Sequence, residues 1–213
     1  MSDDPHRSET GPALSAAAAA EWSRHVESVL RGVAHGLNNR AAALAAMVEL
    51  TSEPAEPPSV LREILATEQQ RVRDLVHAVR IIGAASGEAE ALLPADVVGD
   101  VGLVLQQHPD LRDGAVEIDA THGSPIRVPR WAFARALIAL AAGLVGGTRN
   151  DPRPIVISTA GDWQNLAGDD RGSPATASAL GTELARLMGG EPLEGRYGIR
   201  LPTLATLRRR EGR

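Results

Sequence analysis

The residues best suited to chemistry in this sequence surround His35. Near pH 7 an unperturbed histidine ring is largely neutral, and its nitrogen lone pair can attack phosphorus without a separate base. Asn38 and Asn39 follow within one helical turn and can donate hydrogen bonds to phosphoryl oxygens. Arg31 and Arg40 lie about one turn to either side and can offset negative charge. We expect His35 to act as a nucleophile, assisted by the asparagines, while the arginines contact a partner.

A long helix is predicted to carry His35. Ser15 can cap its start, and the proline-rich stretch from Ser52 to Ser59 breaks it after about Thr51. Apolar and small residues recur along it at steps of four and three, as in the seam of helices that pack together. We expect this seam to be buried, with His35 one step off it: Leu30, Ala34, Leu37, Ala41, Leu44 and Val48.

A second helix is predicted to begin at Val60 and to be ended by Gly83 and Gly87. Its own seam repeats the four-and-three spacing with one polar member: Leu61, Leu65, Glu68, Val72, Leu75, Val79 and Ile82. Two such helices joined by a short loop form an antiparallel hairpin that cannot cover its seam alone. We therefore expect a homodimer whose hairpins make a four-helix bundle. His77 has no asparagine neighbours and is predicted to be a solvated helix residue.

After residue 87 the pattern becomes mixed, with apolar helices and short alternating strands separated by turn residues. The predicted order is helix 94–107, strands 116–119 and 126–128, helix 131–145, strand 155–158, a long irregular loop, helix 174–188 and strand 199–201. Helices over a mostly antiparallel sheet make an α/β sandwich of the α+β class. The expected divisions are a disordered tail 1–13, a hairpin 14–87, an α/β domain 88–205 and a solvated basic tail 206–213.

Composition excludes several other functions. With 43% hydrophobic residues but three Trp, one Tyr and one Phe, the core must be aliphatic, and base stacking has few platforms. A net charge of −5 argues against nucleic-acid binding, and we expect no membrane contact because no apolar stretch is long enough to span a bilayer. There is no cysteine, and the six histidines show no metal-ligand spacing. We expect a cytoplasmic protein without a bound metal.

The sequence His35-Gly36-Leu37-Asn38-Asn39 resembles the phosphoacceptor box of bacterial sensor histidine kinases. In that box the histidine is followed by an acidic residue, Leu and often Asn-Asn. Here Gly36 replaces the acid, and Arg40 stands where proline is common. The resemblance implies phosphohistidine chemistry. The loss of the acid argues against ATP-driven autophosphorylation more than against taking phosphate from an activated donor.

The second half is similar to the ATP-binding domain of these kinases with its ligands lost. The family places an asparagine for magnesium and phosphates on the helix where Ala139 and Gly143 stand here. No Asp-x-Gly-x-Gly box follows the strand at 155–158, and the glycine-rich phosphate loop is reduced to Gly181. The resemblance therefore implies a degenerate kinase-like domain that binds neither ATP nor another cofactor.

The order of these parts, together with residues 80–87 and 179–190, is similar to ChpT-type histidine phosphotransferases. This implies a two-component phosphorelay in which His35 relays a phosphoryl group between receiver-domain aspartates of response regulators, with Mg²⁺ held by the receiver. Two alternatives stay open. One is an inactive pseudo-kinase dimer that acts as a scaffold or inhibitor of a response regulator or kinase, and the other is an ATP-dependent kinase.

Overall fold

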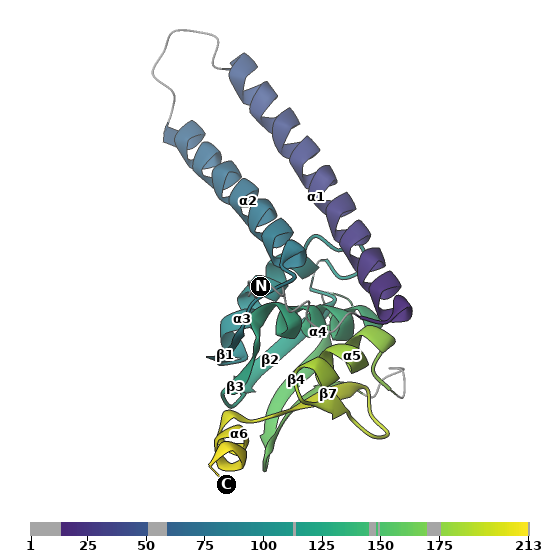
Figure 1. Cartoon of the computed structure of the whole chain (residues 1–213). Helices are drawn as coiled ribbons and strands as arrows, with labels where there is room; N and C mark the ends of the chain where they lie inside the picture. The colour runs from purple at the N-terminus through teal and green to yellow at the C-terminus, as the bar shows by residue number, and fades with distance from the viewer. Residues whose placement is uncertain are drawn as a thin grey trace, which may run out of the picture.

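Two long helices form the N-terminal part of the computed structural model, which describes residues 14–50, 59–112, 114–144, 148, 150–169 and 176–212. Helix α1 spans Ala16–Leu50 and helix α2 spans Ser59–Gly83. They run side by side in opposite directions (Figure 1). The Ser15 hydroxyl accepts a hydrogen bond from the Ala18 amide at 3.3 Å, which confirms the predicted cap. The proline-rich stretch predicted to break the first helix lies, over residues 51–58, outside the described part of the chain.

The α1 seam predicted to be buried is instead largely solvent-exposed in the single chain. Relative exposures run from 37% to 69% for its four large members: Leu30, Leu37, Leu44 and Val48. The buried residues of α1 are Ala18, Trp22, Val29 and Val33, which face the rest of the chain. Helical periodicity identifies an apolar stripe but does not say which neighbour covers it. Burial of the seam against a second hairpin therefore stays a prediction.

The second half of the chain is α+β, as predicted, but its principal sheet is mixed. A small antiparallel pair joins β1 (Ala89–Leu92) to β3 (Ile126–Pro129). The larger sheet has the order β2-β4-β5-β7-β6, in which β2 and β4 are parallel and the remaining pairs are antiparallel. Its strands are β2 (Val116–His122), β4 (Arg153–Ala160), β5 (Trp163–Gly168), β6 (Glu191–Pro192) and β7 (Gly198–Pro202).

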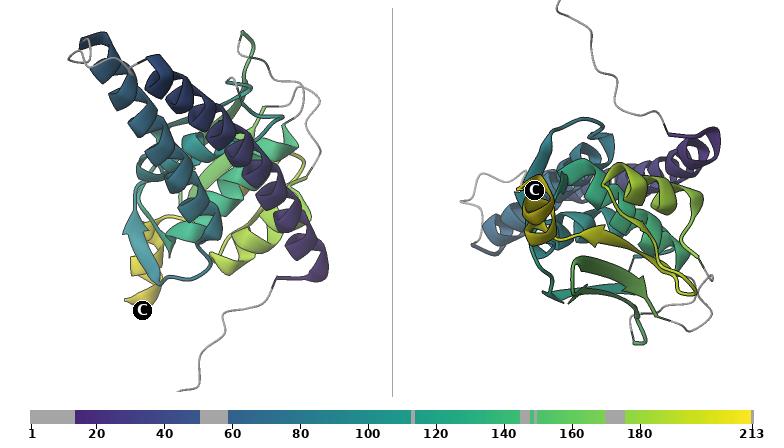
Figure 2. Two further views of the ribbon diagram at one scale, coloured as in Figure 1. Left: turned by 90° about the horizontal axis from the view of Figure 1, so that it is seen from above. Right: turned by 60° about the horizontal axis from the view of Figure 1, so that its bottom comes forward.

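Three helices lie between the hairpin and the sheet: α3 (Ala95–Leu105), α4 (Arg130–Gly143) and α5 (Ala179–Leu187). Figure 2 shows this layer on one side of the strands, with the hairpin beyond it. The core between helices and sheet is fully buried and almost entirely aliphatic, as the composition requires. Its largest members are Phe133, Leu137, Leu140, Ile155, Ile157, Leu166, Leu184 and Ile199.

Two segments predicted to be irregular are ordered elements. The stretch after Ile157 continues through a tight turn at Gly161, whose φ is +59°, into strand β5. The predicted basic tail forms helix α6 (Leu204–Glu211), capped by the Thr203 hydroxyl and tied by an ion pair from Arg209 to Asp162. In addition, α5 begins at Ala179 and not near residue 174, because the Ser178 hydroxyl caps it.

The base of the hairpin is fastened to the helix layer by a buried arginine. The guanidinium of Arg135 on α4 lies 4.4 Å from the Trp22 ring centroid and 5.0 Å from that of Trp131. It also donates a hydrogen bond of 2.7 Å to the carbonyl of Ala84, just past α2. Both hairpin helices therefore contact α4 through one side chain. The division of the chain at residue 87 stays a prediction.

The end of α4 is held by Tyr197. Its buried hydroxyl donates to the Leu140 carbonyl at 2.9 Å, and its ring lies against Gly143 and Gly168. A methyl group at Gly143 would overlap the tyrosine hydroxyl. Among the helices formed by the described residues, none is both long and apolar enough to cross a bilayer.

We predict that Gly143→Ala lowers the free energy of unfolding by about 1 to 3 kcal/mol, because the added methyl overpacks the Tyr197 contact. Gly102→Ala is the matched control, since no atom lies within 4 Å of a methyl built there and alanine favours the helix. We expect that control to raise the free energy of unfolding by about 0.5 to 1 kcal/mol. Urea denaturation of both variants checks this, and equal effects of the two substitutions would contradict the packing.

Candidate functional site

His35 lies in the middle of α1 with its side chain exposed. The side-chain amide nitrogen of Asn39, one turn later, lies 3.2 Å from His35 Nε2 and orients the ring. Asn38 is also exposed, on the same helix. The structure thus brings one of the two predicted asparagines into direct contact with the histidine.

A hollow of about 560 Å³ opens beside the histidine, and we refer to it as the acceptor cleft. One wall is α1, and the other is the segment of residues 106–112 that follows α3. The lining contains three arginines and a histidine but no carboxylate. The lining is therefore richer in cations than in anions, and Glu27 and Glu68 pair with Arg31 and Arg40 from outside it. Its lining residues are Arg31, Gly32, His35, Gly36, Asn39, Arg40, Gln106, Gln107, Pro109 and Arg112.

Two glycines one turn apart allow the walls of the cleft to approach. A methyl group at Gly32 would overlap the backbone carbonyl of Gln107, so only glycine lets α1 cross the 106–112 segment at this distance. A methyl at Gly36 would lie 3.2 Å from Leu75 Cδ2 and 3.8 Å from Gln107 Oε1. The small size of Gly36 therefore lets α1 pack closely on α2.

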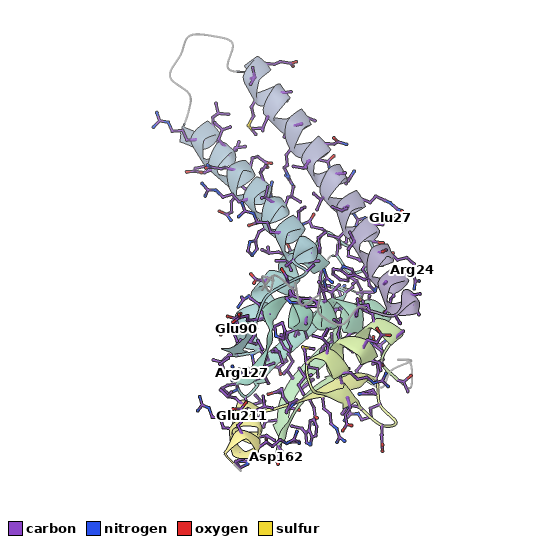
Figure 3. All side chains as sticks on the ribbon, in the orientation of Figure 1. Arg24, Glu27, Glu90, Arg127, Asp162 and Glu211 are labelled. Carbon is purple, nitrogen blue, oxygen red and sulfur yellow. The ribbon has the colours of Figure 1, made fainter. Side chains whose placement is uncertain are left out.

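The two arginines predicted to contact a partner both line the cleft, but in different states. Arg31 pairs with Glu27 at 2.9 Å, and both side chains are exposed on the outside of α1, where Figure 3 labels Glu27. Arg40 donates to both carboxylate oxygens of Glu68 at 3.1 Å, and Arg71 also donates to this carboxylate. Burial alone would raise the pKa of Glu68, but the hydrogen bonds from the two arginines lower it overall. Arg40 thus joins α1 to α2 as well as lining the cleft.

The second wall of the cleft was not predicted from the sequence. Gln106, Gln107 and Arg112 lie about seventy residues beyond His35 in sequence, and no local pattern connects them to it. The one sequence feature that could have indicated the contact is Gly32, a helix-interior glycine, because such a residue often marks a close backbone approach.

Two further histidines lie at the contact between α1 and the 106–112 segment. The rings of His25 and His108 are 6.0 Å apart, and both are largely buried. Burial lowers the pKa of His25, although Glu21, 3.8 Å from Nε2, acts in the opposite direction. Burial likewise lowers the pKa of His108, whose Nδ1 accepts a hydrogen bond from the Asp110 amide. Protonation of either ring therefore opposes this contact.

Within the part of the chain that the structure describes, no group of three or more His, Asp or Glu side chains is placed to hold a metal ion.

Comparison with solved structures shows distant likenesses. No protein-family model matches the sequence. No curated protein matches it either. Among solved structures, the chain is similar to the Acinetobacter baumannii histidine kinase AdeS, with 15% identity and a TM-score of 0.40, over 80% of this chain and 98% of that one. A functional assignment must therefore come from the residues of the chain itself.

We predict that stability falls between pH 7.5 and pH 5.5. Unfolded histidines have a pKa near 6.5, whereas burial lowers the folded pKa of His25 and His108, so the unfolded chain binds protons first. The contribution of these two histidines to the free energy of unfolding is complete above about pH 6.5. It is lost as the pH falls towards their pKa values in the folded protein. Urea denaturation at both pH values measures it. Over this pH range a His25→Gln, His108→Gln double variant should lose less stability than the wild type. His122→Gln changes an exposed histidine and is the control. Equal losses in the double variant and the wild type would contradict the assignment of the pH dependence to His25 and His108.

Proposed function

We propose that this chain is a phosphohistidine carrier of the ChpT type. In this proposal His35 accepts a phosphoryl group from the aspartyl phosphate of a response-regulator receiver domain and passes it to a second receiver. The observation that carries the proposal is the acceptor cleft, in which an exposed, oriented histidine borders a hollow with three arginines and no carboxylate.

The proposed transfer needs little from this chain beyond position and charge. A ring nitrogen of His35 attacks phosphorus, and the bond from phosphorus to the receiver's carboxylate oxygen breaks. The aspartyl phosphate and its Mg²⁺ belong to the receiver, so the carrier supplies a nucleophile and a docking surface. Asn39 orients the ring, while Arg31 and Arg112 place positive charge where the acidic face of a receiver approaches.

The packing at α4 supports a carrier that does not bind ATP. Ala139 and Gly143 stand where the kinase helix presents its metal-binding asparagine, and Gly143 lies against the Tyr197 ring. Burial raises the pKa of Tyr197, so the hydroxyl stays neutral and donates to the helix carbonyls. The Tyr197 side chain thus packs against the end of α4, whereas the corresponding helix end in the kinases faces the nucleotide. We propose that the α/β domain serves instead to hold the 106–112 segment against α1.

The exposed apolar seam supports a homodimer. Large apolar side chains are exposed on α1 at Leu30, Leu37, Leu44 and Val48. Others are exposed on α2: Val60, Ile64, Leu65 and Val79. Stripes of this size on a hairpin are normally covered by another helical surface. We propose that a second copy covers them in a four-helix bundle. His35, one step off the seam, stays accessible in that arrangement.

We predict that His35→Ala abolishes phosphoryl transfer from phosphorylated receiver domains while binding of the receiver is retained, because the variant removes the nucleophile and leaves the cleft. Purified protein is incubated with a panel of radiolabelled phospho-receivers, and label transfer is followed on gels.

His122→Ala, on the exposed edge of β2, is the control and should transfer like the wild type. If wild-type protein binds receivers but never acquires label, or if His35→Ala transfers normally, the carrier proposal fails. Binding without transfer would instead favour the scaffold role.

We predict that Leu44→Glu converts the proposed dimer to a monomer. Each copy loses the burial of one leucine, about 1.5 to 3 kcal/mol, so the dissociation constant should rise at least about 100-fold. Leu93→Glu is a matched control, since Leu93 is equally exposed but lies outside the hairpin. Sedimentation of the three proteins measures the change, and a monomeric wild type at micromolar concentration would refute the dimer.

A further inference from the structure

A second histidine, His77, is held by a carboxylate. His77 on α2 places Nε2 2.9 Å from Asp100 Oδ1 on α3. The other oxygen of Asp100 accepts from Arg130 Nη2, also at 2.9 Å, and the same guanidinium nitrogen donates to the Asp96 carbonyl at 2.7 Å. Arg130, at the start of α4, thereby fixes the carboxylate that faces His77. The prediction of a merely solvated histidine missed this chain of contacts.

The contacts determine which ring nitrogen carries the hydrogen. Partial burial by itself would raise the pKa of Asp100, but hydrogen bonds from His77 and Arg130 lower it overall. The carboxylate is therefore ionised near neutral pH and can only accept hydrogen bonds. Nε2 of His77 must carry the donated hydrogen, so the lone pair of the neutral ring resides on Nδ1.

His77 is also reachable. It borders two hollows, of which one contains Glu88 and Glu90 and the other contains two arginines of α2. Its side chain is 47% exposed. It lines a hollow of about 520 Å³ together with Arg73 and Arg80, which lie about one helical turn to either side on α2. The one carboxylate in that lining, Asp74, accepts from Gln70 at 2.8 Å. For Arg80, the described part of the chain provides no carboxylate partner. A phosphoryl group at Nδ1 would thus meet two guanidinium groups.

We propose that His77 is a second phosphoacceptor, which takes a phosphoryl group from a small acyl phosphate onto Nδ1. The Nδ1 lone pair attacks phosphorus and the P–N bond forms. The bond from phosphorus to the acyl oxygen breaks, and its electron pair leaves with the carboxylate product. Because Nε2 keeps its hydrogen, the ring becomes positively charged during attack, and the Asp100 carboxylate stabilises that charge. Asp100 acts here as a positioning residue.

This site differs from the acceptor cleft in its chemistry. The His35 ring contacts the neutral amide of Asn39, which cannot stabilise a ring cation as a carboxylate does. The His77 hollow is lined by other residues than the cleft, so the two sites can be tested apart.

The test uses the full-length His35→Ala protein with acetyl phosphate, so that failure of the carrier function does not affect the readout. Phosphohistidine is located by mass spectrometry, and the phosphorylated nitrogen is identified by ³¹P NMR. We expect phosphate on Nδ1 of His77 to form at least about tenfold faster than on exposed His122 in the same sample, and His77→Ala to abolish it.

Asp100→Asn should slow the reaction about tenfold, the rate equivalent of one charge-assisted hydrogen bond, and should give a mixture of the two phosphohistidine isomers. Asp74→Asn, which changes a nearby carboxylate on the same helix as His77, should leave both rate and isomer unchanged. Circular dichroism verifies that each variant is folded. The isomer ratio separates orientation of the ring from a general structural effect.

Three results would overturn the proposal: labelling of His77 no faster than His122, labelling on Nε2, or a rate insensitive to Asp100→Asn. In a second arm, the phosphate donor is a phosphorylated receiver domain from which all acetyl phosphate has been removed. Labelling of His77 in that arm alone would refute the small donor, and labelling with acetyl phosphate alone would support it.

Discussion

The candidate site depends on one close approach, the crossing of α1 over the backbone of Gln107 at Gly32. A helix normally keeps a neighbouring backbone at the distance of a side chain, and glycine removes that spacing. The result is that the 106–112 segment lies against the same face of α1 that carries His35 and Gly36. Without this contact Arg112 of the segment would not share a hollow with the histidine.

The rest of the chain maintains that crossing through buried polar anchors. The guanidinium of Arg135 lies between Trp22 and Trp131, and their aromatic faces and the Ala84 carbonyl stabilise this cation. Arg40 and Glu68 similarly join the two hairpin helices above the cleft. Arg135 holds the hairpin at its base, and the pair of Arg40 and Glu68 joins the two helices farther along.

The fold could be predicted where local rules dominate. The two long helices, the cap at Ser15 and the α+β class followed from periodicity, capping and proline chemistry, which act over a few residues. Strand β5 and helix α6 could not be predicted in the same way. Strand β5 has no regular alternation of apolar and polar residues, and its pairing on both sides with β4 and β7 makes it a strand. Helix α6 is secured by the contact of Arg209 with the distant Asp162.

The sequence alone determined that His35 sits on a helix with an amide one turn away, since helical spacing places Asn39 beside it wherever the helix lies. Only the tertiary structure decided that Gln107 and Arg112 complete the cleft, that Asp100 holds His77, and that the leucine stripe of α1 faces outward. Those facts depend on which surfaces meet across tens of residues. Periodicity records that a surface is apolar or charged, whereas the identity of its neighbour is set by packing of the whole chain.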